Sequence, residues 1–525
     1  MAALRDAPDA TNTAQLENRP LCAHVYRALT QLAAELGEDH PAYDPVSLAA
    51  DGLTRPLRVA VGGRISKGKS TLVNALLGRR IAPTGAGETT RIVASFRRGR
   101  SLAGELVMRD APRRPLQLVD GRLPAKLPGV REEDVVSIDV AVDRWPAATP
   151  FEVVDTPGLA GMHADADART GALLTAADGV TRSRIRGAEA LVFLMDREDA
   201  TSVQAIADFA ELAAQPWGRC VNVVGVLNRV DTLVSHLDNV DCWAAARRLA
   251  ADLESRPQVR GRVAGIVPLI ALLAETAAVP GIVSAADAEA LEALAQLPAA
   301  TQLRLLASAD RLRSPDPEVD PVVAVHARGR LLDALGLWGL VQAIADANKG
   351  PVTAASVVAA ARERSGIEAL LAMLRSDLAS QVDALKAQRA IALLEQVGLR
   401  AEAEGDSRLR SVLAGLSGSA QLHPLREIFA LGLRAGGAQL PESLSTRLDQ
   451  VTMSRTTAGK LGQPEDASPV ELALTARTAA QAMQALMSNP AASGDVVRVA
   501  DVLRRSYRLI YVALSEGPPS SGERE

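Results

Sequence analysis

The chain has 525 residues, 23% of them charged, and a formal net charge of −4. That length predicts two or three domains, because one hydrophobic core seldom organises more than about 250–300 residues. The slightly acidic balance argues against a nucleic-acid-binding surface, so we expect no nucleic-acid partner. No uncharged apolar run is long enough to cross a bilayer, and the first residues carry no signal peptide. We therefore expect a cytoplasmic protein that can touch a membrane only at its surface.

The N-terminal residues divide into two parts. Residues 1–15 are polar and predict a disordered N-terminus. Residues 18–36 place leucine and valine side chains three or four positions apart, which predicts an amphipathic helix. We assign residues 16–54 to a helical segment that precedes the first strand.

A phosphate-binding loop follows the apolar run 57–61. The pattern GxxxxGK[ST] occupies residues 63–70 and opens the helical pattern 70–78. Strand, loop and helix in that order are the context in which this pattern binds nucleotide phosphates. We expect the Lys69 ammonium to reach the β- and γ-phosphates and the Ser70 hydroxyl to bind Mg²⁺. The predicted nucleotide-binding residues of this loop are Gly63, Lys67, Gly68, Lys69, Ser70 and Thr71.

Two further segments supply groups that a GTPase needs around the γ-phosphate. Residues 85–91 contain Thr90, which would close on Mg²⁺ and the γ-phosphate. A short strand, 151–154, delivers Asp155 and Gly158 in a DxxG pattern. We expect Asp155 to hold Mg²⁺ through water and the Gly158 N–H to contact the γ-phosphate.

A second buried strand, 220–227, ends in the sequence Asn228-Arg229-Val230-Asp231. A carboxylate at Asp231 can accept two hydrogen bonds from guanine, from N1–H and from the exocyclic amine. Adenine lacks this pair of donors, so ATP would leave a buried Asp231 unpaired. With Asn228 and Arg229, this motif predicts GTP and GDP as ligands.

Residues 55–350 are predicted to form an α/β P-loop domain with a central, mostly parallel sheet and helices on both faces. Two segments inside it, 100–135 and 308–325, are rich in arginine or proline and predict loops or insertions. After Pro351 the pattern becomes helical. Residues 353–400 predict a nearly continuous helix, interrupted at Ser365-Gly366, where a hinge is plausible because glycine breaks helical continuity. Further helices are predicted at 406–417, 424–435, 468–488 and 495–514, before a disordered tail, 516–525.

These motifs resemble those of the dynamin superfamily of GTPases. Ser66 stands two residues before Gly68 as in dynamins, residues 85–91 resemble their switch I, and residues 155–159 resemble their switch II. Beyond the GTPase motifs, residues 330–339, 423–427 and 504–507 resemble the bacterial dynamin-like proteins of the isoniazid-inducible type. Two positions depart from the pattern: Ile65 replaces a glutamine of eukaryotic dynamins, and Arg229 replaces the usual lysine. The segment expected to border the base, 267–272, also lacks the common serine.

The resemblance implies a set of roles at the nucleotide. Ser66, Lys69 and Thr90 would be catalytic, and Ser70, Thr90 and Asp155 would bind Mg²⁺, the last through water. A monovalent cation, K⁺ or Na⁺, would assist. The partners implied are anionic membrane lipids, a second copy of the chain bound through the GTPase domain, and a paralogous dynamin-like protein.

The resemblance also implies a helical neck and trunk beyond the GTPase domain. The neck would combine residues 16–54, 351–365 and 491–515, and the trunk would comprise residues 366–490 with a membrane-proximal tip. One loop combines apolar and basic residues suited to lipid, Met453, Arg455, Lys460 and Leu461. An ordinary inter-helix loop is the alternative interpretation there, and residues 436–441 form a rival tip.

The sequence therefore predicts a dynamin-like GTPase. It would use GTP hydrolysis to drive membrane binding and remodelling, by fission, fusion or repair, at the inner face of a bacterial cell membrane. One alternative is an RNA-linked GTPase of tRNA modification or ribosome assembly, which should show a basic surface or an RNA-binding module. Another is a nucleotide-gated scaffold with negligible turnover. GTPase rates with and without liposomes would separate the three.

Overall fold

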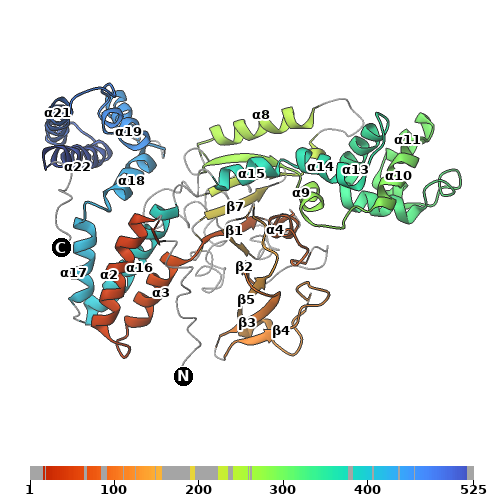
Figure 1. The fold of residues 1–525 in the computed structure, drawn as a ribbon, viewed down its shortest axis with the longest axis horizontal. Coiled ribbons are helices and arrows are strands. Elements are labelled where there is room, and N and C mark those ends of the chain that lie inside the picture. The colour runs from red at the N-terminus through yellow and green to blue at the C-terminus, as the bar shows by residue number, and fades with distance from the viewer. Residues whose placement is uncertain are drawn as a thin grey trace, which may run out of the picture.

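The computed structural model describes most of the chain. The described residues are 16–17, 19–63, 68–83, 92–109, 112–124, 126–147, 149, 151–156, 188, 190–195, 223–233, 241–257, 259, 263–375, 382–404, 407–435, 438–454 and 456–516. The predicted disorder of residues 1–15 lies outside them, as does that of the tail 516–525 apart from Glu516, which ends the last helix. Figure 1 shows a central sheet flanked by helices, and two groups of helices to the left of it.

A single mixed sheet forms the centre of the described α/β domain. Its strands lie in the order β4-β3-β5-β2-β6-β1-β7-β8-β9. Their bounds are β1 Leu57–Gly63, β2 Ala94–Arg98, β3 Ala103–Met108, β4 Arg114–Leu116, β5 Val135–Val142, β6 Phe151–Asp155, β7 Ala190–Met195, β8 Val223–Asn228 and β9 Gly265–Leu269. This arrangement confirms the predicted α/β class.

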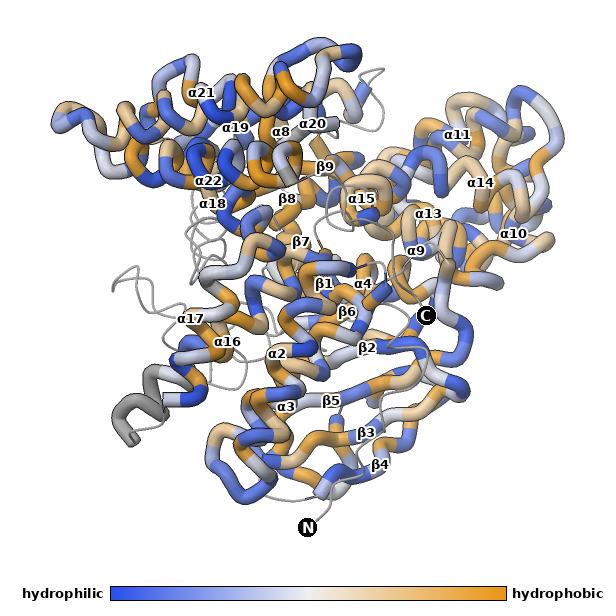
Figure 2. Tube along the Cα trace, turned by 60° about the vertical axis from the view of Figure 1, so that its left-hand side comes forward, coloured by the Kyte–Doolittle hydropathy of each residue, from blue (hydrophilic) through white to orange (hydrophobic). Residues whose placement is uncertain are grey.

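The half of the sheet from β6 to β9 is parallel. Every residue of β7 and β8 is buried, as expected of central strands covered on both faces. Figure 2 shows these strands as apolar segments in the interior. Side chains alternate between the two faces along β1, so Val59 and Val61 join one hydrophobic cluster and Ala60 joins the other. Because the strands run parallel, their carboxyl ends lie along one edge of the sheet.

The other half of the sheet corrects the interpretation of 100–135 as loops. Strand β3 pairs antiparallel with both β4 and β5, and β5 runs parallel to β2. On the exposed face, the Arg113 guanidinium lies 3.3 Å from the Glu105 carboxylate and 3.0 Å from that of Asp139. The sequence did not predict these strands because charged side chains on their exposed face interrupt the apolar spacing. Such cross-strand ion pairs are common in strands that are exposed on one face.

Helices cover both faces of the sheet. The helices of this domain are α4 Lys69–Leu77, α8 Cys242–Ser255, α9 Ala271–Ala278, α10 Ala285–Ala295, α11 Ala299–Leu306, α12 Ala309–Arg313, α13 Val325–Ala347, α14 Ala354–Ser365 and α15 Ile367–Met373. Of these, α10, α11 and α12 lie beside the sheet, packed on α13 and on one another (Figure 1). Helices α4 and α15 contribute to the cluster on one face, and α8 and α13 to the cluster on the other.

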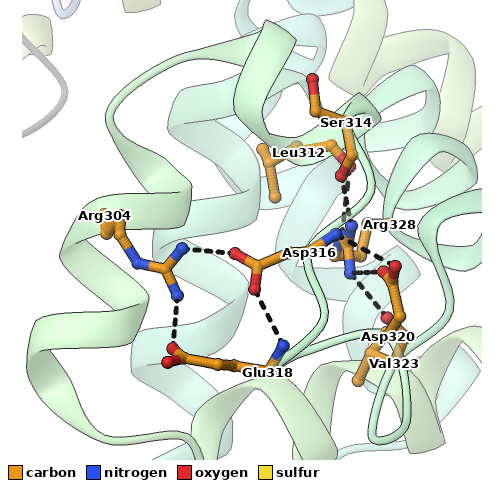
Figure 3. Close-up of polar contacts among 8 residues, drawn as sticks. All are labelled: Arg304, Leu312, Ser314, Asp316, Glu318, Asp320, Val323 and Arg328. Atoms are coloured by element: carbon orange, nitrogen blue, oxygen red, sulfur yellow. Dashed lines mark hydrogen bonds and ion pairs between the residues drawn. The ribbon is translucent and has the colours of Figure 1, made fainter.

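The second segment interpreted as a loop, 308–325, is ordered around one buried cation (Figure 3). The Arg328 side chain is fully buried. It donates to the carbonyl oxygens of Leu312, Ser314 and Val323 at 3.2, 2.7 and 2.8 Å, and to the Asp320 carboxylate at 2.7 Å. Arg328, which follows the segment in the sequence, therefore holds its backbone in place. The local sequence of 308–325 does not reveal this contact.

Helix α14 corrects the predicted neck. We expected residues 351–365 to pack with the N-terminal and C-terminal helices, but α14 packs against α9 and buries Val357 and Ala361 in a cluster of the α/β domain. The interruption predicted at Ser365-Gly366 is confirmed, because α14 ends there and Gly366 has φ +78°. A Cβ there would lie 2.5 Å from the Pro268 carbonyl oxygen, so the chain bends where only glycine fits.

The neck consists of α2 Pro20–Leu36, α3 Tyr43–Thr54, α16 Val382–Glu404 and α17 Arg408–Gly418, which share one hydrophobic cluster. This corrects the predicted trunk, 366–490, which included α16 and α17. Side chains of α16 form hydrogen bonds with backbone groups at the start of α2 and near the end of α3. The Asp383 carboxylate accepts the backbone N–H groups of Leu21 and Cys22 at 3.0 and 2.7 Å, and the Lys386 ammonium donates to the Gly52 carbonyl oxygen at 3.0 Å. These contacts join segments more than 300 residues apart.

The trunk consists of α18 His423–Ala435, α19 Glu442–Met453, α20 Thr457–Lys460, α21 Pro469–Met487 and α22 Gly494–Glu516. The helices predicted at 406–417, 424–435, 468–488 and 495–514 are confirmed as α17, α18, α21 and α22. The predicted packing of the last one is wrong, because α22 lies against α18, α19 and α21 instead of the N-terminal helices. No described helix combines the length and apolarity needed to cross a bilayer.

Candidate nucleotide-binding site

Two glycines, one at each end of the phosphate loop, lie within the described residues. Gly63, the last residue of β1, has φ +144°, and a Cβ there would lie 2.6 Å from the Leu194 carbonyl oxygen. Gly68 precedes α4 with φ +90°, and a Cβ there would lie 2.5 Å from Nδ2 of Asn228. Both positions therefore require glycine, and the second brings the guanine motif next to the loop. The predicted residues Ser66 and Lys67 lie outside the described residues.

Asp155 is the most perturbed acidic group of the site. It ends β6, beside β1, and is 1% exposed. Neither carboxylate oxygen accepts a hydrogen bond within the described part of the chain. Burial raises the pKa of Asp155 to about 7, against the opposing effects of the Lys69 ammonium and the Ser70 hydroxyl. The Lys69 charge and the Ser70 hydroxyl offset only part of the cost of burying this carboxylate, so a cation bound beside it would stabilise the site.

Lys69 and Ser70 open α4 on the same side as Asp155. Burial lowers the pKa of Lys69, and the Asp155 charge opposes this shift. The next residue after Asp155 is fixed as well, since the Thr156 hydroxyl donates to the Val61 carbonyl oxygen at 2.8 Å. The Ser70 hydroxyl and the Asp155 carboxylate together form an all-oxygen donor set that suits Mg²⁺. The residues present therefore fit this ion.

The guanine motif lies at the end of β8, as the sequence predicts. The Asn228 side-chain oxygen accepts the backbone N–H of Ala271 at 2.9 Å, at the start of α9. Arg229 adopts a left-handed conformation with φ +60°, and it turns the chain into the single turn Val230–Thr232. Burial raises the pKa of Asp231, and its Oδ1 atom accepts no hydrogen bond from any described residue. This unpaired acceptor is the group expected to meet the base.

The segment 267–272, predicted to border the base, is a tight turn between β9 and α9. Only Ile270 separates the two elements, and its N–H donates to the Ser365 carbonyl oxygen at 2.8 Å. The backbone N–H groups of Ile270 and Ala271 are thus both engaged within the protein, by Ser365 and by Asn228.

The sequence interpretation missed Gly336 as a residue of this site. Helix α13 is interrupted there, at φ +67°. A Cβ on Gly336 would lie 3.4 Å from Leu272 and 4.0 Å from Oδ2 of Asp231. The Thr276 hydroxyl satisfies the Ala334 carbonyl oxygen beside the interruption, at 2.5 Å. A glycine within an otherwise helical pattern was the signal that could have found it.

The remaining predicted residues fall in three groups. Thr71 lies in α4 next to Ser70. Thr90, Gly158 and Arg455 lie outside the described residues, as does the Met453 side chain. Leu461 is 8% exposed and packs in the trunk cluster with Ala458, so its assignment as a lipid contact is wrong. The Lys460 charge acts on Glu427, in the first half of α18, which places this loop toward the neck end of the trunk.

Comparisons with known proteins agree with this geometry. A model of the dynamin family matches residues 59–230, from β1 to the guanine motif. The isoniazid-induced protein IniC of Mycobacterium tuberculosis is 32% identical over 347 residues, which cover 66% of this chain and 67% of that protein. Two solved structures are similar at 13% identity. One is an oligomerised bacterial dynamin pair described as sensing and tethering membranes (TM-score 0.34, covering 95% of this chain and 76% of that one). The other is LeoA, a bacterial dynamin GTPase from ETEC (TM-score 0.26, covering 96% and 90%). On the strength of the family match and the IniC identity, the chain belongs to the dynamin family and is a bacterial dynamin-like GTPase of the isoniazid-inducible type.

Proposed function

We propose that this protein uses GTP hydrolysis to drive membrane binding and remodelling at the inner face of a bacterial cell membrane. The observation that supports GTP binding and hydrolysis is that Lys69, Asp155 and Asp231 follow the carboxyl ends of three strands, β1, β6 and β8, in the parallel half of the sheet. In open α/β sheets, ligands bind at this edge. The pKa values of both carboxylates, Asp155 and Asp231, are raised because the protein buries them.

Some of the described residues would bind the phosphates and others the base. Lys69 would stabilise charge that develops on the β- and γ-phosphates, and Ser70 and Asp155 would hold Mg²⁺. When bound, Mg²⁺ neutralises phosphate charge and orients the γ-phosphate for attack by water. Asp231 would select guanine, with Asn228 and Gly68 joining the base and phosphate halves. We further propose that Ser66, Thr90 and a monovalent cation assist the attack, as in related GTPases.

The membrane contact would lie at the end of the trunk away from the neck. There, the segment 438–441 and the α21–α22 connection enclose a notch of about 440 Å³. Its lining contains no charged residue and includes Leu440, Pro441, Leu486 and Ala492. This supports the tip first considered at 436–441 over the loop with Leu461. Anionic lipids, a second GTPase domain and a paralogous dynamin-like protein are the proposed partners.

Turnover and sedimentation with liposomes test this function. We expect GTP hydrolysis by the wild type, its loss in Lys69→Ala, and co-sedimentation of the wild type with anionic liposomes. Replacing Leu440 and Ala492 together by Glu should weaken sedimentation and leave basal turnover unchanged, because the tip is remote from the nucleotide. Leu303→Glu is the matched control, since Leu303 is 60% exposed on α11 of the α/β domain. Absence of turnover would refute the enzymatic role, and absence of sedimentation with any lipid would refute the membrane role.

A further inference from the structure

A fully buried polar cluster lies behind the phosphate site, and none of the roles assigned above uses it. Asn74, on α4, is completely buried. Its side-chain oxygen accepts the backbone N–H groups of Ile81 and Ala82 at 3.0 and 2.9 Å. Its amide nitrogen donates to the Ala82 carbonyl oxygen at 3.1 Å and to Glu275 Oε1 at 2.9 Å. All four contacts of one amide are thus satisfied, and three of them hold the same two backbone residues.

Glu275 closes the cluster from the other side. Only 2% of this residue is exposed. Its second carboxylate oxygen lies 3.0 Å from the Arg80 guanidinium, which is one-third exposed. Replacing a buried ionic group by a well-packed apolar one is often neutral or stabilising. Stability alone therefore does not explain why Asn74 and Glu275 are buried here. Holding the backbone of residues 81–82 in one geometry does explain it, because a fully satisfied polar network specifies a unique arrangement.

The cluster connects two parts of the nucleotide site. Residues 81–83 lead directly into the segment that carries Thr90. Glu275 lies one turn after Ala271, whose N–H binds the guanine-motif residue Asn228. Helix α9 therefore touches the guanine motif at its first residue and the backbone before Thr90 through Glu275 and Asn74.

We propose that Asn74 and Glu275 are positioning residues for GTP hydrolysis. They hold the backbone of Ile81 and Ala82 at a fixed distance from α4 and α9, so that the following residues start from a defined point relative to the phosphates. Within the part of the chain that the structure describes, neither side chain makes a hydrogen bond to a predicted ligand group. Their effect should therefore appear in the rate of hydrolysis and not in the affinity for nucleotide, and the proposal rests on the GTPase function proposed above.

The test compares single-turnover GTP hydrolysis with affinity for GDP, both expressed per nucleotide-binding site as titrated with a fluorescent GDP analogue. Asn74→Ala removes the four contacts and should slow hydrolysis between about ten-fold and a hundred-fold, which is the scale of a small misplacement of reacting groups. The GDP dissociation constant should stay within about three-fold, because Lys69, Ser70 and Asp231 are untouched. Glu275→Gln keeps an acceptor for Asn74 and should retain most of the rate.

Thr149→Val is the matched control. Thr149 is buried and also contacts α4, but its hydroxyl donates to the Leu76 carbonyl oxygen near the C-terminal end of that helix, at 2.8 Å. This variant should lower the melting temperature and keep the rate per site. Equal rates in Asn74→Ala and the wild type, or equal losses in Asn74→Ala and Thr149→Val, would overturn the positioning role.

If Asn74→Ala does not fold, two other variants test the proposal: Asn74→Asp alone, and Asn74→Asp combined with Glu275→Gln. Asn74→Asp preserves acceptors for the backbone N–H groups but sets a carboxylate against Glu275, so it should be slow. Adding Glu275→Gln relieves that repulsion and should recover much of the rate, and a lack of recovery would count against the proposal. A wild type that does not hydrolyse GTP would instead contradict the proposed function, so the two failures are distinguishable.

Discussion

Asp155 should make the nucleotide-free protein less stable at neutral pH than a variant that lacks its charge. Burial raises the pKa of Asp155 from its ordinary value of 3.8 to about 7. A carboxyl with a raised folded-state pKa stabilises the fold below its unfolded pKa, and that stabilisation is lost as pH rises through the folded pKa. Asn resembles the protonated acid in shape and cannot ionise. Asp155→Asn should therefore be as stable as the wild type near pH 4 and more stable at pH 8.

The size of the effect follows from the two pKa values. A difference of one pKa unit corresponds to 1.36 kcal/mol, so a rise from 3.8 to about 7 corresponds to about 4 kcal/mol. The gap in unfolding free energy between variant and wild type should open between pH 4 and 7 and then stay constant. With Mg²⁺ and GDP the order should reverse, because ligand that binds only the folded wild type stabilises it by mass action.

Urea unfolding followed by tryptophan fluorescence measures this gap. All four tryptophans lie between residues 145 and 338, so the signal reports the α/β domain. Glu105→Gln, which removes an exposed negative charge on β3, is the control for net charge. A stability difference that does not change with pH, or a wild type that is the more stable protein at pH 8 without ligand, would refute the reasoning.

Three further predictions use other groups. Arg328→Met should lower the unfolding free energy by about 3–5 kcal/mol, because buried carbonyl oxygens and the Asp320 carboxylate lose their donor; urea unfolding checks this, and a loss under about 1 kcal/mol would contradict it. Burial lowers the pKa of His423 to about 4, so its contribution to trunk stability is present above pH 6.5 and lost as pH falls through 4. Hydrogen exchange in α18 and α22 should show this loss, and His423→Gln should show less of it. Asp231→Asn should weaken GTP binding by about 2–4 kcal/mol and favour xanthosine triphosphate; calorimetric titration decides, and unchanged GTP affinity would remove the guanine assignment.

The nucleotide site could be predicted because its requirements are local. Gly63 and Gly68 are needed where the backbone has positive φ and meets Leu194 and Asn228, and the sequence shows both glycines directly. Asp155 and Asp231 follow apolar runs that predict buried strands, and both runs are strands in the structure. Because parallel strands end at one edge, their order in the sequence was sufficient to bring these groups together. Gly336 escaped notice because its neighbours, Leu272 and Asp231, are far from it in sequence.

Helix positions could be predicted as well, since the spacing of apolar residues marks each helix by itself. The partners of those helices could not. Helices α14 and α22 carry apolar faces that suit many neighbours, and only the folded chain shows α14 against α9 and α22 against α21. The same holds for Leu461, an apolar residue in a basic loop, which the structure places in the trunk core.

The sequence by itself determined the chemistry of the phosphate and guanine motifs and the α/β class. The tertiary structure decided the order of the edge strands, the partners of the neck helices and the ordering of 308–325 around Arg328. The physical reason is the range of the interactions. Backbone conformation and helical or strand periodicity depend on residues a few positions apart, whereas packing partners and buried ion pairs depend on contacts between residues that only the completed fold brings together.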